Sequence, residues 1–315
     1  MLHLIVMNGL CIGYILLMYF VYHFFILIKQ FIRHPKDLNN FGEWCIVTDG
    51  INGIGKAICF ELASKGQNIL IIGGNELKLN RVINEINDIY PDIVLEKCHI
   101  NLSKFDDDMQ NRYKNAIQNK NIGVLINNVG LSYQTDNERI ENIMKVGNEA
   151  STTIVHITLK EFLKYHENDP NKLSAIVNIS SKDYVNKITS DLGFKYSGKG
   201  ISFQVQSPYF VSSKMGKIGN PTFITPTAQK FAKYSVSQIG YDGLIYPYPK
   251  HALMFFIASL LPQKLTTMYL HNIYDKIMDL GNKKMVTKQK MKMKKSEMGT
   301  VFQSRKPGSV IKMID

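Results

Sequence analysis

The chain has 315 residues, enough for one large α/β domain with appendages or at most two small domains. Its formal net charge is +12, and 45% of its residues are hydrophobic, an ordinary value for a globular protein with one membrane segment. The four cysteines and eight histidines show no metal-ligand spacing. We therefore expect no metal site, no disulfide framework and a folded part in a reducing compartment.

An uncharged N-terminal segment is the first expected element. Leu4–Ile28 has no acidic or basic residue apart from His23, and as a helix it would be about 37 Å long, enough to cross a bilayer. A cleaved signal peptide is the alternative, but the apolar run is long and no basic segment precedes it. We expect a retained transmembrane anchor over residues 1–28 and a basic linker over residues 29–43.

Positive residues follow this segment at Lys29, Arg33 and Lys36, and none precedes it. The positive-inside rule therefore predicts that the rest of the chain faces the cytosol.

From Trp44 onward, largely apolar strands alternate with helices. This order predicts an α/β fold, a Rossmann-like doubly wound parallel sheet covered by helices on both faces. The expected strands are Trp44–Thr48, Asn68–Ile72, Ile93–Asn101, Gly123–Asn127, Leu173–Ile179 and Ile201–Val205, and the helices between them are Ile54–Lys65, Glu76–Tyr90, Lys104–Lys120, Asn137–Tyr165 and Lys182–Ser197.

Beyond the sixth strand the pattern is less regular. Thr227–Gly240 is consistent with one helix, and Ala252–Pro262 is strongly apolar but too short to span a bilayer. Ala252–Pro262 could pack on the domain or lie in the membrane interface, and we take packing on the domain as the expectation. The folded domain is expected to cover residues 44–275.

Residues 276–315 form a basic tail that we expect to be disordered. No aromatic residues interleave with its lysines, which favours a solvated tail or a contact with anionic lipid over nucleic-acid binding. The lysines concerned are Lys283, Lys284, Lys288, Lys290, Lys292, Lys294 and Lys295.

The stretch Trp44–Gly55 reads WCIVTDGINGIG, a short strand, a glycine-rich turn and the start of a helix. Glycines allow the backbone to approach a pyrophosphate, and a helix N-terminus offers it free N–H groups. A tight strand-to-helix turn without a ligand explains this stretch equally well, so the rest of the chain must decide.

Four stretches together resemble the short-chain dehydrogenase/reductase family, from about Trp44 to about Ala258. They resemble most the membrane-anchored branch that contains very-long-chain 3-oxoacyl-CoA reductase and 17-beta-hydroxysteroid dehydrogenases. The stretches are GINGIGKAI at Gly50–Ile58, LINNVGLSY at Leu125–Tyr133, QSPYFVSSKM at Gln206–Met215 and HALM at His251–Met254.

This resemblance implies hydride transfer from a nicotinamide to a ketone, with NADP (NADPH) as the expected cofactor and NAD as the alternative. It implies a cofactor site at Gly50, Asn52, Gly53, Ile54, Gly55, Asn101, Asn127, Asn128, Gly130 and Lys182. It also implies catalytic roles for Ser181, Lys182 and Asn148, the last of which aligns with the family asparagine that helps to hold a proton-relay water.

The chain departs from the family between its fifth strand and the following helix. In the family, roughly a dozen residues separate the catalytic serine from a tyrosine, and a lysine follows four residues later. Here Lys182 directly follows Ser180 and Ser181, so the loop that carries the tyrosine is missing. Either the chain is a non-catalytic relative, or its sequence comes from an incomplete gene model or a skipped exon.

Other tyrosines are poor substitutes for the missing one. Tyr196 precedes Lys199 by three residues, one short of the family spacing, and is expected where the helix ends. Tyr184 follows Lys182 and is expected to point elsewhere.

The cofactor end also departs from the family. Asp49 replaces the first glycine of the turn, and its carboxylate would repel a pyrophosphate unless it turns away. Gly74 replaces the arginine that favours a 2′-phosphate, for which Lys78 could compensate, and Asn101 replaces an aspartate near the adenine.

We therefore expect an oxidoreductase of the endoplasmic reticulum membrane that reduces a lipid ketone, either a 3-oxoacyl-CoA or a 17-ketosteroid. The alternative is a non-catalytic, membrane-tethered relative that binds lipid or a partner protein. Family members often dimerise through their long helices, so a homodimer is possible here.

Overall fold

The computed structural model describes residues 2–102, 105–128, 149–169, 171–180, 183–212 and 221–262, with residues 264–266, 268, 269, 272 and 276. Seven parallel strands form one sheet in the order β3-β2-β1-β4-β5-β6-β7. The strands are β1 (Trp44–Val47), β2 (Asn68–Gly73), β3 (Leu95–His99), β4 (Ile122–Asn127), β5 (Ser174–Ile179), β6 (Ile201–Gln206) and β7 (Gly243–Ile245).

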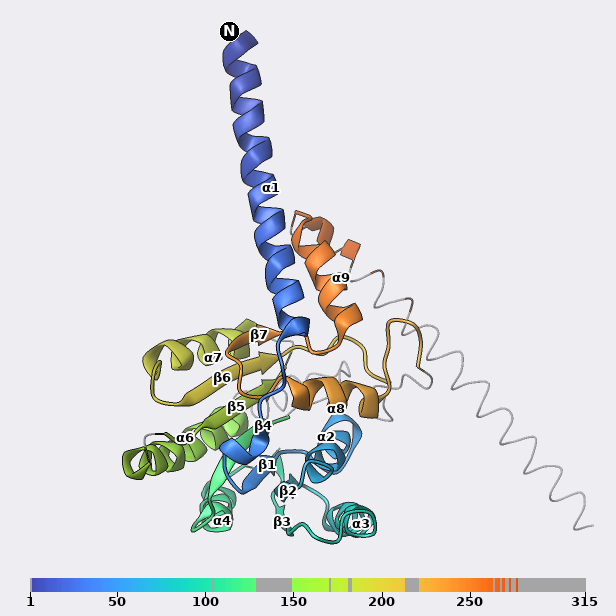
Figure 1. Cartoon of the computed structure of the whole chain (residues 1–315). Helices are drawn as coiled ribbons and strands as arrows, with labels where there is room; N and C mark the ends of the chain where they lie inside the picture. Colours follow the sequence, from blue (N-terminus) through green and yellow to red (C-terminus); the bar gives the residue numbers. More distant parts are fainter. Residues whose placement is uncertain are drawn as a thin grey trace, which may run out of the picture.

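Helices cover both faces of the sheet (Figure 1). One face carries α2 (Gly53–Ala63), α3 (Glu76–Asn87) and α8 (Ala228–Ser237), and the other carries α4 (Asp107–Ile117), α6 (Ser151–Asn168) and α7 (Asp183–Lys195). Alternate residues of each strand enter the two cores, because side chains on a strand point to opposite faces. Cys45 and Val47 of β1 belong to the first core, and Trp44 and Ile46 belong to the second.

This architecture confirms the predicted doubly wound parallel sheet. The strand order reverses between β1 and β4, where the chain crosses from one half of the sheet to the other. Open α/β sheets bind ligands at the carboxyl ends of the strands beside such a reversal. The fold therefore points to the loops after β1 and β4 as the place for a site.

Two apolar helices lie outside the sheet layers. The first, α1 (Leu2–Ile32), projects away from the domain, and α9 (Pro249–Ser259) runs beside the part of α1 nearest to it (Figure 1). Val6–Ile32 has a mean hydropathy of 2.2, so α1 is long and apolar enough to cross a membrane. A signal sequence near the N-terminus can meet the same criterion of length and hydropathy.

The end of α1 is fixed to the domain by polar contacts. Gln30 donates to the carbonyl oxygen of Tyr246 at 2.7 Å. The guanidinium of Arg33 donates to Oε1 of Gln238 and lies 3.7 Å from the centre of the Tyr241 ring. Residues 29–43, expected as a linker, thus contact the domain, and their short helix η1 (Leu38–Asn40) buries Leu38.

The structure differs from the sequence-based expectation mainly beyond β6. The short edge strand β7 was missed because it has only three residues and begins at a glycine with φ of +89°. Helix α9 begins at Pro249, three residues before the expected apolar stretch, because proline is suited to the first turn of a helix. Only its buried face fits the expected packing on the domain.

Candidate functional site

The carboxyl ends of the central strands meet in a buried hydrogen-bond network. Asn127, at the end of β4, donates from Nδ2 to Oγ of Ser151 and to Oδ1 of Asn178, both at 2.7 Å. Asn178 in turn donates to Oγ1 of Thr189 on α7 at 2.9 Å. Thr48 joins the network through its contact with Asn127 and accepts from the backbone N–H of Asn128 at 2.8 Å. This network fixes β1, β4, β5, α6 and α7 relative to one another beneath the site.

The turn between β1 and α2 has the backbone of a glycine turn, although one of its residues is an aspartate. Asp49 has φ of +48° and Gly53 has φ of +51°. A left-handed conformation costs little at glycine and more at any residue with a β-carbon. Asp49 therefore stands at a position whose backbone geometry favours glycine.

Burial also disfavours the charge of Asp49. The half-buried carboxyl loses hydration, which raises its pKa to about 7, and the positive charge of Lys78 partly opposes this effect. Asp49 is not one of the residues that line the cleft described below. Lys78 does line that cleft. When the carboxyl of Asp49 is ionised, its negative charge offsets part of the positive charge of Lys78, which is unfavourable to an anionic ligand.

Helix α2 begins without a side-chain cap. Its N-cap residue Asn52 makes no capping hydrogen bond, whereas Asn75, Asp106 and Thr227 cap α3, α4 and α8. The first N–H groups of α2 are therefore left for another acceptor. A phosphate oxygen is a suitable acceptor, because the positive end of the helix dipole favours a negative charge.

A cleft of about 860 Å³ opens in front of this helix terminus, between α2, α3 and the start of α8. Asn52 and Gly53 line it at the turn, and three cations line it elsewhere: Lys56, Lys78 and Arg81. Lys56 is paired with Glu85, whereas no ion pair among the described residues involves Lys78 or Arg81. The cleft has the size and charge to hold an extended anionic ligand.

The neighbouring strand end has room for a larger side chain. A β-carbon on Gly74 would lie 3.6 Å from Cα of Asn101, an ordinary van der Waals contact, and residue 74 is exposed. Asn101, which follows β3, thus adjoins Gly74 at the carboxyl end of β2. Nothing in this backbone requires a glycine at position 74.

Most of the predicted cofactor residues come together at this edge of the sheet. Gly50, Asn52, Gly53, Ile54, Gly55, Asn101, Asn127 and Asn128 all lie at the carboxyl ends of β1, β3 and β4 or in the first turn of α2. The predicted cofactor residue Gly130 and the predicted catalytic residues Asn148, Ser181 and Lys182 lie outside the described residues.

Only three residues of the sequence separate the end of β5 from the described start of α7. β5 ends at Ile179 and the described part of α7 begins at Asp183, with Ser180, Ser181 and Lys182 between them. A loop long enough to carry a tyrosine over the site is absent from this part of the chain.

The described tyrosines nearest to the site have different surroundings. Tyr184 lines a second pocket, between α6 and α7, together with Ser151 and Asn178 of the buried network. Tyr196 stacks on Phe203 with ring centres 6.1 Å apart. Tyr209, after β6, contacts the ring of Phe255 edge-on at 5.8 Å. Burial raises the pKa of Tyr209 to about 12, so its hydroxyl is a weak acid.

His251 connects α9 to the loops after β6. Its Nδ1 accepts from the backbone N–H of Tyr209 at 3.3 Å, and its Nε2 donates to the carbonyl oxygen of Ile224 at 3.1 Å. The side chain is fully buried, and this burial lowers the pKa of His251 to about 4. A neutral His251 therefore has a structural role, holding two loops against α9.

Sequence reasoning missed several residues of this region. Arg81 follows Lys78 by three positions, so a helical pattern places both on one face and could have identified Arg81. Asn178 is the one polar residue between Ala175 and Ile179, a signal for a buried hydrogen bond. Ser151 and Thr189 gave no signal, because their partners, Asn127 and Asn178, lie on other elements of the fold.

A family profile described as "short chain dehydrogenase" matches residues 43–222. The chain belongs to the short-chain dehydrogenase family. The match covers more than half of the chain and includes the turn before α2, the central strands and the residues between β5 and α7. This family is one of NAD(P)-dependent oxidoreductases, in agreement with the resemblance found in the sequence.

Similar proteins point to one branch of this family. The chain is 32% identical to very-long-chain 3-oxoacyl-CoA reductase of Mus musculus, over 70% of this chain and 76% of the relative. It is 30% identical to a very-long-chain 3-oxoacyl-CoA reductase-like protein of Arabidopsis thaliana, over 75% of this chain and 82% of the relative. It is also 28% identical to inactive hydroxysteroid dehydrogenase-like protein 1 of Homo sapiens, over 72% and 75%.

Solved structures of this short-chain dehydrogenase fold are similar as well. A 7beta-hydroxysteroid dehydrogenase aligns with a TM-score of 0.62 and 17% identity, over 74% of this chain and 98% of that chain. A short-chain dehydrogenase from Sphingobium yanoikuyae, solved in complex with NADPH, aligns with a TM-score of 0.55 and 16% identity, over 65% and 87%.

Proposed function

We propose that this short-chain dehydrogenase is a membrane-anchored, NADPH-linked reductase of a lipid ketone, either a 3-oxoacyl-CoA or a 17-ketosteroid. The observation that carries the proposal is the uncapped start of α2, which opens onto a cleft lined by Lys78 and Arg81. The identity to very-long-chain 3-oxoacyl-CoA reductases supports the substrate class. The domain from residue 44 to residue 275 would hold this site, and residues 276–315 would form a basic tail.

The residues at the cleft fit NADPH. The N–H groups at the start of α2 would bind its pyrophosphate, and Asn128 and Asn101 would lie beside the nucleotide. Lys78 and Arg81 would attract the 2′-phosphate in place of the arginine that Gly74 replaces. NAD is the alternative cofactor. It is the less favoured one, because it lacks the phosphate that these two cations would attract. When bound, NADPH would supply the hydride.

The candidate site has no tyrosine at the family position for proton transfer. Addition of hydride to a ketone leaves an alkoxide that must be protonated, and a positioned acid accelerates such a step by about 100- to 10,000-fold. By their position in the sequence, Ser181 would orient the ketone and Lys182 would contribute positive charge beside it. Without a tyrosine at the family position, water must supply the proton, so we expect turnover slower by about that factor.

The membrane would hold this domain near its lipid substrate. Helix α1 would span the bilayer, with residues 1–28 as the anchor and the basic residues 29–43 on the cytosolic side. We propose the endoplasmic reticulum membrane, because elongation of very long acyl chains is the role implied by the reductase branch. A homodimer through α6 and α7 would be compatible with this arrangement.

A non-catalytic role is the second candidate. Two observations favour it: the three-residue connection between β5 and α7, and Asp49 in the glycine position of the turn. The identity of 28% to an inactive human relative supports the same candidate. Such a protein would keep the fold and bind a lipid or a partner protein without turnover.

Purified full-length protein in lipid nanodiscs would separate the two candidates. We expect slow oxidation of NADPH with a 3-oxoacyl-CoA or a 17-ketosteroid, abolished by Lys182→Met and retained by Lys187→Met on the exposed side of α7. NADPH binding without turnover would support the non-catalytic candidate. Absence of both binding and turnover would overturn the enzyme proposal. Sequencing of the transcript across Ile179–Lys182 would reveal whether a longer product restores a tyrosine.

A further inference from the structure

Helix α9 exposes an apolar face. His251, Ala252, Met254 and Ala258 are buried against the domain. No charged side chain lies between Lys250 and Lys264. The opposite face exposes Leu253 and Ile257, and Leu260 and Leu261 directly after the helix are exposed as well, with 39–49% of each residue accessible. A soluble protein rarely leaves such a continuous apolar surface uncovered.

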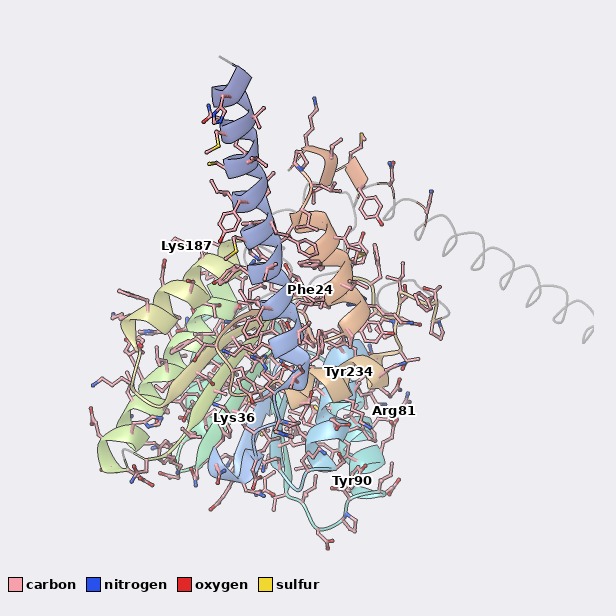
Figure 2. All side chains as sticks on the ribbon, turned by 45° about the horizontal axis from the view of Figure 1, so that its top comes forward. Phe24, Lys36, Arg81, Tyr90, Lys187 and Tyr234 are labelled. Atoms are coloured by element: carbon pink, nitrogen blue, oxygen red, sulfur yellow. The ribbon has the colours of Figure 1, made fainter. Side chains whose placement is uncertain are left out.

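This face continues the apolar surface of α1. Phe256 of α9 contacts two aromatic residues of α1, with ring centres 5.5 Å from Phe20 and 5.9 Å from Phe24. Figure 2 shows Phe24 where the two helices meet, while Lys36 lies beyond the end of α1 toward the domain. The two helices therefore have a fixed position relative to each other, and the depth of one determines the depth of the other.

The positions of these contacts along α1 give that depth. The uncharged part of α1 ends at Ile28, eight residues after Phe20 and four residues after Phe24. At about 1.5 Å per residue, Phe256 touches α1 about 6–12 Å inside the apolar segment. Helices that lie in a membrane interface bury their apolar face to a depth of about 5–10 Å. If α1 crosses the bilayer, α9 cannot remain wholly in water.

We infer that α9 is a second membrane element, inserted with its Leu253–Leu261 face into the same leaflet that the end of α1 crosses. This inference rests on the proposed anchoring by α1. Helix α9 has 11 residues and is therefore about 16 Å long, too short to span a core of about 30 Å. It would be inserted in one leaflet only, with Lys250 at the surface.

The insertion would place one side of the candidate site at the lipid surface. Phe255 of α9 stacks on Tyr246 with ring centres 4.2 Å apart, and it contacts Tyr209 in the loop after β6. These three rings connect the inserted helix to the carboxyl edge of the sheet. A lipid ketone that leaves the bilayer along α9 would meet this aromatic cluster before it reaches bulk water.

Depth-dependent fluorescence quenching would test the inference. Trp44 is the single tryptophan and is 9% exposed in the domain, so a new tryptophan on an exposed position gives a separable signal. The full chain would be reconstituted in vesicles of phosphatidylcholine brominated close to the headgroup or near the chain end. Three exposed sites would be compared: Ile257→Trp on α9, Leu16→Trp on α1 and Leu77→Trp on α3.

We expect Ile257→Trp to lose most of its added emission with the shallow bromolipid and Leu77→Trp to lose none. Leu16→Trp should be quenched if α1 crosses the bilayer. If Leu16→Trp is quenched and Ile257→Trp is not, α9 is covered by another copy or another part of the chain, and the inference is wrong. If neither is quenched, the proposed anchoring fails, and the inference fails with it. Leu253→Trp serves as a second reporter should Ile257→Trp not fold.

Discussion

A β-carbon on Gly55 would lie 2.7 Å from Nδ2 of Asn128, and it would also overlap the carbonyl group of Asp49. The loop after β4, the turn after β1 and the first turn of α2 therefore meet at a point where no side chain fits. The backbone of Asp49, which takes part in this close packing, lies in the left-handed region with φ of +48°. A β-carbon makes this conformation unfavourable at Asp49.

Replacing Asp49 by glycine should relieve this strain. We expect Asp49→Gly to raise the free energy of unfolding by about 1 kcal/mol, because glycine adopts a positive φ without the steric cost of a β-carbon. The same change removes a carboxylate near the cleft, so the Kd for NADPH should fall. Urea denaturation and NADPH titration would measure the two effects.

Asn119→Gly provides a matched control for this change. Asn119 is the other described non-glycine residue with positive φ, at +62°, and it is exposed at the end of α4. We expect it to change stability by no more than Asp49→Gly and to leave the Kd for NADPH unchanged. An equal effect of both variants on NADPH would contradict a local electrostatic role of Asp49.

The raised pKa of Asp49 predicts a pH dependence. In the folded protein the carboxyl is neutral up to about pH 7, whereas it ionises near its ordinary value of 3.8 when the chain is unfolded. The unfolded state therefore binds fewer protons between these values, so this group lowers stability as pH rises from 3.8 to 7. NADPH affinity should also fall as pH rises through 7, and Asp49→Asn should flatten both profiles.

Gly74→Arg should increase the preference for NADPH over NADH. The site accepts a β-carbon at ordinary contact distance from Asn101. A guanidinium there could form charge-assisted hydrogen bonds with the 2′-phosphate, each of about 1.5–3 kcal/mol, or about 10- to 100-fold in Kd. The ratio of the two Kd values is the measurement. Leu77→Arg adds the same charge on the exposed side of α3 and should change the ratio little.

His251→Ala should destabilise the fold by about 1–3 kcal/mol, because Tyr209 and Ile224 would lose their hydrogen-bond partner in a buried place. His156→Ala, at an exposed position on α6, should cost little. The pKa of His251 is lowered to about 4, so its neutral form stabilises the fold above pH 6.5, and this stability is lost as pH falls toward 4. Denaturant titrations at several pH values would measure both effects. Equal free energies of unfolding for the His251→Ala and His156→Ala variants would contradict this role of His251.

Local sequence patterns predicted the sheet well, because each strand is marked by a short run of neighbouring residues. Apolar runs such as Gly123–Asn127 and a glycine turn at a strand end are visible in single segments of the sequence. The packing of the N-terminal and C-terminal segments depends on contacts between residues that are far apart in the sequence. The hydrogen bonds between Arg33 and Gln238 join residues 205 positions apart, and the contact of Phe24 with Phe256 joins two helices at opposite ends of the chain.

The candidate site also has some features that the sequence predicted and others that depend on the folded structure. The resemblance to a known family predicted Asn127, Asn128 and Asn101, and all three lie at the expected edge of the sheet. The strain and burial of Asp49 depend on α2 and α3, so the sequence showed only that its charge was out of place. The catalytic residues Asn148, Ser181 and Lys182 stay predictions, because they lie outside the described residues.

Calorimetric titration of NADPH into the full-length protein tests the central claim, that the cleft before α2 binds this cofactor. We predict saturable binding of one NADPH per chain, weakened by about 10-fold or more in Lys78→Ala through loss of a charge-assisted contact. Lys187→Ala, which removes a lysine on α7, should bind as tightly as the unchanged protein. Absence of saturable binding to folded protein, or equal affinity of the two variants, would contradict the claim.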